Sequence, residues 1–449
     1  MKKNAFGLVS LIYLIILVMA INLPAFWDMY GQVRTADYFI ENRFTKFFPD
    51  GNSYSDNGHM PFYPLYLAVL FRLLGFKLWV AHLSILPFLW GSLWQLKKLS
   101  ARFLGEEQVW KVLLFTLLVP AFVTQSIYFS QELALVFFSL WLMNAVLGER
   151  SSHMALAALA LCLFNLRGIS LCTLLLLYYA VYKKQKSAWY LLCGPAAWLA
   201  GVWLHYRAAG WFFAGHEIKE FRAFAGFAGM LKNAAVCIWK ALDQGAVFGW
   251  AAIALIALRK KRLAEPLILL LLVLLSVAGP CILFTNPIGN RYFLLWYVLL
   301  LPAFFYSVAS LKKKIAALII FCFAAALISN NWITYPNRYG NAWDCSLKSL
   351  PYFNLRKQLD EYVAKEQIPA KDVSAGFQLY FNDRYYLMNG QDHAYALLSD
   401  TEMPATLYVA DSDICNNYNP QREKFLKENY ALQRTFRSGA VYINLYKRR

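Results

Sequence analysis

Charged residues are scarce in this chain of 449 residues, and acidic residues are scarcer than basic ones. Only 16% of the residues are charged, with 26 Asp and Glu against 44 Lys and Arg, whereas 59% are hydrophobic and 17% are aromatic. A soluble fold of this length has too little polar sequence to cover so much apolar surface. The composition therefore excludes an ordinary water-soluble protein and predicts a membrane protein.

Cysteine motifs and internal repeats are also missing. None of the eight cysteines forms a Cys-x-x-Cys pair, so the sequence predicts no structural metal site. Cys345 and Cys415 could still form a disulfide in an oxidising compartment. No repeat of fixed period is present, so neither a solenoid nor an inverted-repeat transporter is indicated.

Long apolar runs are what the chain has in abundance. A run of about 16 to 20 residues can cross a hydrocarbon core roughly 30 Å thick at about 1.5 Å per residue. We predict eleven membrane helices, at about residues 7–26, 78–96, 109–127, 131–147, 153–166, 168–182, 188–206, 243–258, 265–284, 293–310 and 315–332.

Basic clusters fall at alternate ends of these runs, as the positive-inside rule requires. The clusters are Lys2-Lys3, Lys97-Lys98 with Arg102, Lys183-Lys184 with Lys186, Arg259 to Arg262, and Lys312 to Lys314. This pattern predicts a multi-pass protein of the inner (plasma) membrane with a cytoplasmic N-terminus and an outer C-terminus. The first run has no small-residue cleavage site before Trp27, so we expect a retained signal anchor. Contact with lipid headgroups accounts for the net charge of +18, so nucleic acid is not an expected partner.

The chain changes character after the last apolar run. We predict a membrane domain over residues 1–332, with a first outer loop at 27–60 and an outer amphipathic segment at 207–242. Residues 333–449 are mixed and polar, and we predict that they form a small α/β domain on the outer face. Its expected elements are helices at 355–366 and 421–428 and strands at 406–410 and 440–446.

The first outer loop is the one long polar stretch near the start of the chain. It holds Asp28, Asp37, Glu41, Asp50, Asp56, Arg34, Arg43, Lys46 and His59. A plain connector needs far fewer residues, so we predict that the loop contributes to a chemical site.

Several of these loop residues also have simpler interpretations. Asp37 and Glu41 have helical spacing and fit a solvated face, and Asp50 in Pro-Asp-Gly-Asn fits a turn. His59 either contacts substrate or caps the next helix. Tyr63, in the aromatic run that follows, either lines a sugar pocket or belongs to an interfacial aromatic belt.

Four ionisable residues stand where the outer ends of the predicted helices should meet. Asp28 follows the first helix, Glu132 starts the fourth, Arg167 separates the fifth and sixth, and Arg291 precedes the tenth. A charge inside the bilayer costs about 2.5 to 3.5 kcal/mol, so such residues either snorkel to the interface or face a polar cavity. For any one residue both interpretations stay open.

Arg167 interrupts what otherwise reads as one apolar stretch. A guanidinium group matches phosphate oxygens, so Arg167 and Arg291 are candidates for holding a lipid phosphate. Asp28 could accept a proton or orient a hydroxyl. Together these groups suit the displacement of a phosphate leaving group at the anomeric carbon of a sugar by an acceptor hydroxyl.

Five short motifs carry a family resemblance. They are Trp27-Asp28, Gly58-His-Met-Pro-Phe-Tyr-Pro-Leu-Tyr66, Tyr128-Phe-Ser-Gln-Glu132, Leu166-Arg-Gly168 and Asn290-Arg-Tyr-Phe-Leu-Leu295. In this order they resemble the membrane glycosyltransferases of the GT-C superfamily that use polyprenyl-phosphate sugars, such as protein O-mannosyltransferases and the aminoarabinose transferases of lipid A. The chain departs from many relatives in having Asp28-Met29 in place of two acids, and His59 in place of a lysine.

The resemblance implies a site and a reaction. Asp28 takes the role of the catalytic carboxylate, with Arg167 and Arg291 near the lipid phosphate. The further residues that we predict to bind substrate are Asp37, Asp56, His59, Tyr63, Glu132 and Tyr292. A divalent cation held by Asp28 and a neighbouring loop acid is an alternative that the resemblance leaves open.

We therefore expect an all-α polytopic membrane domain of GT-C type with a small outer α/β domain. Its expected activity is transfer of a sugar, with inversion, from a polyprenyl-phosphate carrier in the bilayer to an envelope lipid, glycan or protein. The alternatives are a transporter or flippase of lipid-linked sugars, and a polymerase or ligase of envelope polysaccharide.

Overall fold

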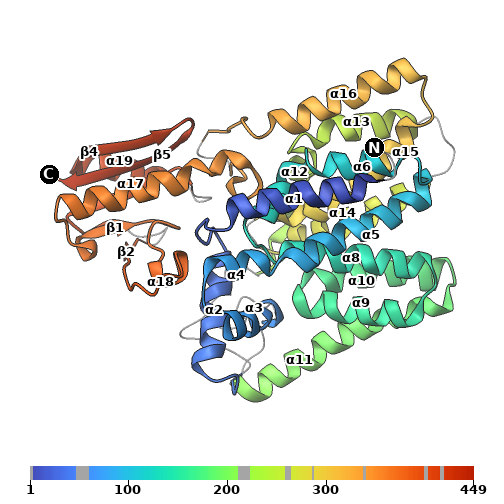
Figure 1. Ribbon diagram of the computed structural model, residues 1–449, viewed down its shortest axis with the longest axis horizontal. Coiled ribbons are helices and arrows are strands. Elements are labelled where there is room, and N and C mark those ends of the chain that lie inside the picture. The colour runs from blue at the N-terminus through green and yellow to red at the C-terminus, as the bar shows by residue number, and fades with distance from the viewer. Residues whose placement is uncertain are drawn as a thin grey trace.

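The computed structural model describes residues 4–46, 60–210, 223–257, 264–285, 288–336, 340–398, 403–414 and 419–449. A helical bundle forms one end of the molecule, and a smaller α/β unit forms the other (Figure 1). The N-terminus lies at the end of the bundle that is far from the α/β unit.

The bundle contains most of the helices. Its first half comprises α1 (Ala5–Ala20), α2 (Met29–Glu41), α3 (Phe62–Leu74), α4 (Leu78–Leu83), α5 (Leu86–Leu104), α6 (Val109–Thr116), α7 (Pro120–Ile127), α8 (Glu132–Leu147), α9 (Ser151–Phe164), α10 (Arg167–Leu176) and the π-helix η2 (Leu177–Tyr182). Its second half comprises η3 (Lys186–Leu192), α11 (Cys193–Ala209), α12 (Gly226–Leu242), α13 (Ala246–Ala257), α14 (Glu265–Leu283), η5 (Asn290–Phe293), α15 (Leu294–Val308) and α16 (Lys313–Ser329).

Each of the eleven predicted apolar runs coincides with helix, but not all form one long span. In the described residues, three helices are long and apolar enough to cross a membrane: Lys186–Ala208, Glu265–Leu283 and Asn290–Val308. A fourth span results if α6 and α7, which are bent by 59°, count as one. The bend precedes Pro120, which begins α7 because proline lacks the amide hydrogen that a continuous helix needs. The prediction of eleven full spans is thus only partly confirmed.

The first predicted outer segment is more helical than expected, and the second contains an amphipathic helix, as expected. Residues 27–60 were predicted to form a loop, yet α2 occupies Met29–Glu41 because apolar residues such as Val33 and Ala36 lie on one buried face. Residues 47–59 lie outside the described part. Within the predicted segment 207–242, helix α12 packs against α14, as expected of an amphipathic helix.

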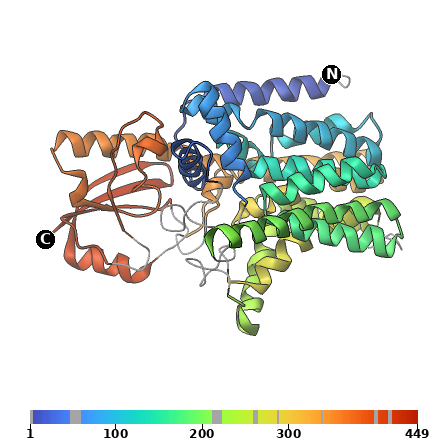
Figure 2. The ribbon, with the colours of Figure 1, turned by 90° about the horizontal axis from the view of Figure 1, so that it is seen from below.

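The C-terminal unit is a mixed sheet with helices on both sides. It contains η6 (Trp343–Cys345), η7 (Leu347–Ser349), α17 (Pro351–Lys365), η8 (Ala370–Asp372), β1 (Val373–Ala375), α18 (Asp383–Tyr386), β2 (Ala396–Leu397), β3 (Tyr408–Ser412), α19 (Pro420–Asn429), β4 (Tyr430–Ser438) and β5 (Val441–Arg448). The strand order is β2-β1-β3-β5-β4; β1 is parallel to both β2 and β3, and β5 is antiparallel to both β3 and β4. Figure 2 shows α17 and α19 on opposite faces of the sheet.

The four secondary-structure elements predicted in this unit are confirmed as α17, α19, β3 and β5. Strands β1, β2 and β4 were missed. The first two are only three and two residues long, and β4 exposes five consecutive residues, so it lacks the alternation of buried and exposed positions that marks a strand.

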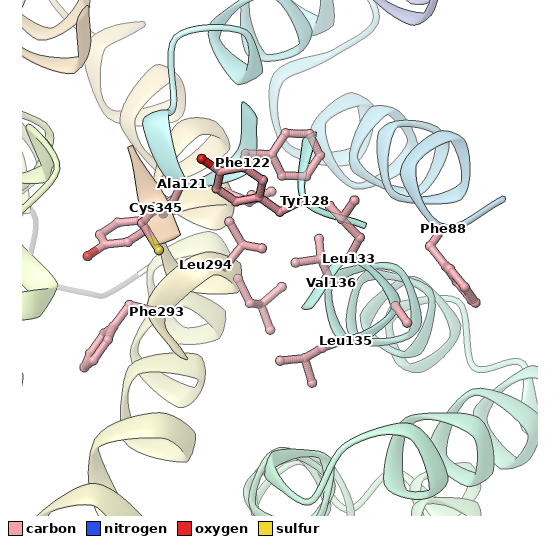
Figure 3. Packing of buried hydrophobic residues seen from close by; sticks show 14 of the residues in the cluster. Phe88, Ala121, Phe122, Tyr128, Leu133, Leu135, Val136, Phe293, Leu294 and Cys345 are labelled. Atoms are coloured by element: carbon pink, nitrogen blue, oxygen red, sulfur yellow. The ribbon is translucent and has the colours of Figure 1, made fainter. Parts of the chain in front are cut away.

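Bundle and sheet share one continuous apolar core. Figure 3 shows part of it, where Leu133 and Val136 of α8 lie near Leu294, the first residue of α15. Cys345 lies in the same packing, although its position in the sequence falls beyond the predicted boundary at residue 332. The first turns of the C-terminal segment are therefore buried against the bundle.

Candidate active site

Several helices begin at one place in the molecule, and each brings a charged residue there. Asp28 directly precedes α2, Glu132 is the first residue of α8, Arg167 is the first of α10, and Arg291 lies in η5 just before α15. These are the four residues that the sequence predicted to share the outer ends of helices. The structure joins them, with Tyr292 and Asp344, into one set of contacts, which we call the outer charge network.

Arg291 is at the centre of the outer charge network. Its guanidinium Nη2 lies 2.5 Å from Oδ2 of Asp28, and its Nη1 lies 3.1 Å from Oδ2 of Asp344. Arg291 and Asp344 are buried, whereas 46% of the Asp28 side chain is exposed. The guanidinium therefore contacts one buried carboxylate and one that solvent or a substrate can reach.

Tyr292 connects Arg291 to the second arginine. Its ring centroid lies 5.4 Å from Cζ of Arg291 and 4.6 Å from Cζ of Arg167, within the range of cation–π attraction. Arg167 also donates to the backbone oxygen of Tyr292 at 3.3 Å and forms an ion pair with the buried Glu132. Among the described residues, the other carboxylate oxygen of Glu132 is buried without a hydrogen-bond partner, so it can accept one from a ligand.

The backbone is strained beside three acids of the outer charge network. Trp27, Phe129 and Ala342 have φ values of 57°, 37° and 53°, a region that side-chain-bearing residues seldom adopt. They lie one, three and two residues before Asp28, Glu132 and Asp344. Such strain persists only where the surrounding structure enforces it, and it is concentrated at functional sites.

Buried polar contacts hold these strained turns. The hydroxyl of Tyr63 donates to the backbone oxygen of Phe129 at 2.5 Å, and Gln125 Nε2 donates to the backbone oxygen of Asp344 at 2.5 Å. Tyr63 was predicted to bind substrate, but its contact is with the protein backbone that positions Glu132.

A second group of polar residues lies next to the outer charge network. Asp243, which follows α12, accepts hydrogen bonds from Asn290 Nδ2 at 2.7 Å and from the hydroxyl of Tyr335 at 2.8 Å. Because Asn290 directly precedes Arg291, these bonds fix the turn that carries the central arginine. Nearby, Lys348 donates to the backbone oxygen of Ile333 at 2.7 Å.

Burial changes the acid–base properties of the C-terminal contributors. It raises the pKa of Asp344 above its usual range, while the nearby Arg291 guanidinium limits that rise. Burial also lowers the pKa of Lys348 to about 8. The network therefore depends on opposite charges that stabilise one another in a poorly solvated place.

Asp37 lies elsewhere on α2, in contact with the α/β unit. Arg384 of α18 lies 2.6 Å from Oδ2 of Asp37 and 2.6 Å from Oε1 of Glu41. The ring of Tyr30 stacks on that of Phe381 at 4.0 Å between centroids. These contacts join α2 to the α/β unit. Asp56 and His59, also predicted to bind substrate, lie outside the described residues, as does Cys415 of the predicted disulfide.

Asp344 and Asp243 are the residues that the sequence analysis missed. Asp243 stands at the start of a predicted apolar run, the same signal that identified Glu132, and could have been found by it. Asp344 lies in the polar C-terminal segment, where nothing in the sequence distinguishes it from other acids.

A divalent cation held by Asp28 and a neighbouring loop acid stays a prediction, since Asp50 and Asp56 of that loop lie outside the described residues. The described residues contain no group of three or more His, Cys, Asp or Glu side chains arranged to hold a metal ion. The accessible carboxylate of Asp28 faces an arginine instead.

The fold matches solved structures of ArnT from Cupriavidus metallidurans. With ArnT bound to undecaprenyl phosphate, the TM-score is 0.55 at 11% sequence identity, and the match covers 98% of this chain and 97% of that one. With ArnT in the apo state, the TM-score is 0.52 at 12% identity, with the same coverage. No protein-family profile and no curated protein sequence matches the chain. The chain thus has the fold of ArnT over nearly its whole length.

Proposed function

We propose that the protein is a membrane glycosyltransferase that moves a sugar from a polyprenyl-phosphate carrier to an envelope acceptor, with Asp28 as the general base. The observation that carries this proposal is the contact between the accessible carboxylate of Asp28 and the buried guanidinium of Arg291. This contact supports the proposal because a carboxylate can accept a proton and a guanidinium can bind a phosphate. The ArnT structure that shares the fold contains undecaprenyl phosphate, a carrier of the required class.

The surroundings of Arg291 suit a phosphate group. Arg167 and Arg291 flank the ring of Tyr292, so two guanidinium groups are within reach of one ligand. The helices α2, α8 and α10 all begin beside the network. Helix N-termini carry a partial positive charge and free amide hydrogens, which attract anions.

Pairing with carboxylates does not prevent phosphate binding. The Asp28 side chain is about half exposed, and an ion pair that is open to solvent contributes little free energy. The donor phosphate can therefore replace Asp28 on Arg291. Asp28 is then released beside the anomeric carbon, where a base is needed.

The reaction is a single displacement. Asp28 takes the proton from the acceptor hydroxyl as the hydroxyl oxygen forms a bond to the anomeric carbon. The bond between that carbon and the phosphate oxygen breaks, and the polyprenyl phosphate leaves with the electron pair. Arg291 and Arg167 stabilise the negative charge that develops on the leaving phosphate, and attack from the opposite face gives inversion.

The position of the charges also favours transfer over transport. The outer charge network lies at one end of the bundle, next to the α/β unit, whereas transporters hold their ionisable residues near the bilayer midplane. We infer that this end faces the outer side of the inner membrane. There it would meet lipid, glycan or protein acceptors of the envelope.

The test uses membranes that contain the full-length protein, supplied with polyprenyl-phosphate sugars labelled in the sugar. Asp28→Asn keeps the size and polarity of the side chain but removes the base, so transfer should fall about 10²- to 10⁴-fold. Label transferred to envelope material is measured against the amount of folded protein.

Glu41→Gln is the matched control. Glu41 also belongs to the α2 region, its side chain is 47% exposed, and it also contacts an arginine, Arg384. Transfer by this variant should stay near the wild-type rate. Full activity in Asp28→Asn, or an equal loss in both variants, would contradict the assignment of Asp28 as the base.

A further inference from the structure

A cavity lies at the opposite end of the helical bundle, away from the outer charge network. Its volume is about 420 Å³, and the side chains around it come from the last turns of α5 and α8 and from the start of α9. Figure 1 shows these helix ends on the side of the bundle that is far from the α/β unit. We call it the basic cavity because of its lining.

Cations dominate the charged groups of the basic cavity. Lys98, Arg102 and Arg150 line it, against the single carboxylate of Glu106. All four residues are exposed, and within the described part of the chain none of the three cations forms an ion pair with a carboxylate. The cavity therefore has a positive charge that the protein does not neutralise.

Neutral hydrogen bonds give the cavity a fixed polar wall. Asn144 Nδ2 donates to the backbone oxygen of Gln95 at 2.8 Å and to its side-chain oxygen at 3.0 Å, which ties α8 to α5. Trp141 Nε1 donates to Nδ1 of His153 at 3.1 Å. In the neutral ring the proton of His153 is then on Nε2, which offers one more donor.

The turn between α8 and α9 positions Arg150 in the lining of the basic cavity. Helix α8 ends at Gly148, and Glu149 adopts a φ of 53°, which turns the chain sharply toward α9. The side chain of Arg150 lies back along this turn, and its Nε is 3.7 Å from the position that a Cβ on Gly148 would take. The side chain of Arg150 is thus within ordinary contact distance of position 148.

The location fits the headgroup layer of a bilayer. Lys97 and Lys98 lie over the ring of Trp94, each with Nζ 5.1 Å from a ring centroid, and Trp94 is 42% exposed. Exposed tryptophans and lysines are typical of the membrane interface. The same end of the bundle carries Lys312 to Lys314 at the start of α16 (Figure 1).

We propose that the basic cavity binds the phosphate headgroup of an anionic phospholipid. Basic pockets between membrane helices bind such headgroups through Lys and Arg, and the two chains of the lipid would lie along the outside of the bundle. The cavity is separate from the proposed transfer site, so lipid would act there as a bound structural ligand and not as a substrate.

The test compares two triple variants of the full-length protein in lipid nanodiscs. Lys98→Gln/Arg102→Gln/Arg150→Gln removes the cations of the cavity. Lys312→Gln/Lys313→Gln/Lys314→Gln removes the same charge from exposed positions at the same end, outside the cavity lining. Native mass spectrometry measures phosphatidylglycerol retained from nanodiscs of phosphatidylcholine with phosphatidylglycerol.

Wild type and the α16 variant should retain phosphatidylglycerol in preference to phosphatidylcholine. The cavity variant should retain at least about tenfold less phosphatidylglycerol than the wild type. A protease-accessible tag on the C-terminus, assayed in sealed membrane vesicles before extraction, checks that all three proteins keep one orientation. Equal retention by the two variants would overturn the proposal. Stabilisation of the wild type by inorganic phosphate, with no preference for phosphatidylglycerol, would overturn the lipid assignment in favour of a soluble anion.

Discussion

The two ends of the helical bundle carry cationic side chains in opposite circumstances. Next to the α/β unit, Arg167 and Arg291 are largely buried, and each contacts at least one carboxylate. At the far end, Lys98, Arg102 and Arg150 are exposed around a cavity and form no ion pair with the described residues. Both ends offer guanidinium groups to an anion, but only one end fixes them in place.

Burial explains the difference. A guanidinium that is removed from water loses several kcal/mol of hydration, and it stays charged and ordered only when opposite charges and hydrogen bonds compensate. Glu132 and Asp344 supply that compensation, and they also fix the direction in which each arginine points. Exposed cations need no such partner. Fixed, compensated charges suit the stabilisation of a leaving group, while free ones suit adhesion to lipid.

Removing a carboxylate that pairs with a buried arginine of the outer charge network should have the largest effect on stability. Glu132→Gln leaves Arg167 without its carboxylate partner, so the free energy of unfolding should fall by about 3 to 5 kcal/mol. Lys98→Gln at the far end should change the free energy of unfolding by less than about 0.5 kcal/mol, because Lys98 is exposed and forms no ion pair with the described residues. Chemical denaturation in mild detergent measures both.

The double variant Glu132→Gln/Arg167→Gln sharpens this prediction. Removing both charges should recover a good part of the loss, because no uncompensated charge then remains buried. If the double variant is as unstable as the sum of the two single ones, Glu132 and Arg167 act independently, and the distinction between the two ends loses its physical basis.

A smaller effect on stability, with a clear effect on transfer, is expected from Asp344→Asn. Asp344 is one of two carboxylates in contact with Arg291 among the described residues, so its loss leaves Asp28 in contact alone and holds the proposed base more firmly on the arginine. Stability should fall by about 1 to 3 kcal/mol. Transfer should fall at least about tenfold, which corresponds to about 1.4 kcal/mol of activation free energy.

Asp360→Asn provides the control for Asp344→Asn. Asp360 also accepts from a buried arginine, since Arg356 Nε lies 2.9 Å from its Oδ1, but the pair is inside helix α17 of the α/β unit. This variant should lose stability while the transfer rate per folded molecule stays near normal. Equal losses of transfer in the two variants would mean that Asp344 acts only through stability.

Sequence patterns predicted the helices and four charges of the network because these depend on local composition. A charge at the end of an apolar run marks a helix end near the interface, whichever helices later become neighbours. Asp28, Glu132, Arg167 and Arg291 were found in this way, and the structure brings them together.

Local sequence patterns could not show which of these residues contact one another. Asp344 reaches Arg291 only because the segment after α16 folds back into the bundle, which is a property of the tertiary fold. Asp37 and Glu41 do lie on one helix, as their spacing predicted, but the interpretation as a solvated face is wrong for Asp37, which is buried. Their shared partner Arg384 is more than three hundred residues away in the chain. The prediction of eleven full membrane spans is only partly confirmed, and hydropathy did not register the bend between α6 and α7 before Pro120.

Substitution of Arg384 tests whether burial or location determines how much a charge contributes to stability. Among the changes considered next to the α/β unit, it should have the smallest effect on stability. It lies near the α/β unit, like the outer charge network, yet its side chain is 41% exposed, more like the lining of the basic cavity. Its contacts with Asp37 and Glu41 are each 2.6 Å long; the pair with Glu41 is exposed and weakens in salt, whereas Asp37 is buried and would lose its counter-charge. Arg384→Gln should therefore lower stability by about 1 kcal/mol, well below the loss in Glu132→Gln, with transfer within about twofold of wild type, and raising the salt concentration should reduce the difference. A loss as large as that of Glu132→Gln, unchanged by salt, would show that proximity to the α/β unit, and not burial, determines how much each charge contributes.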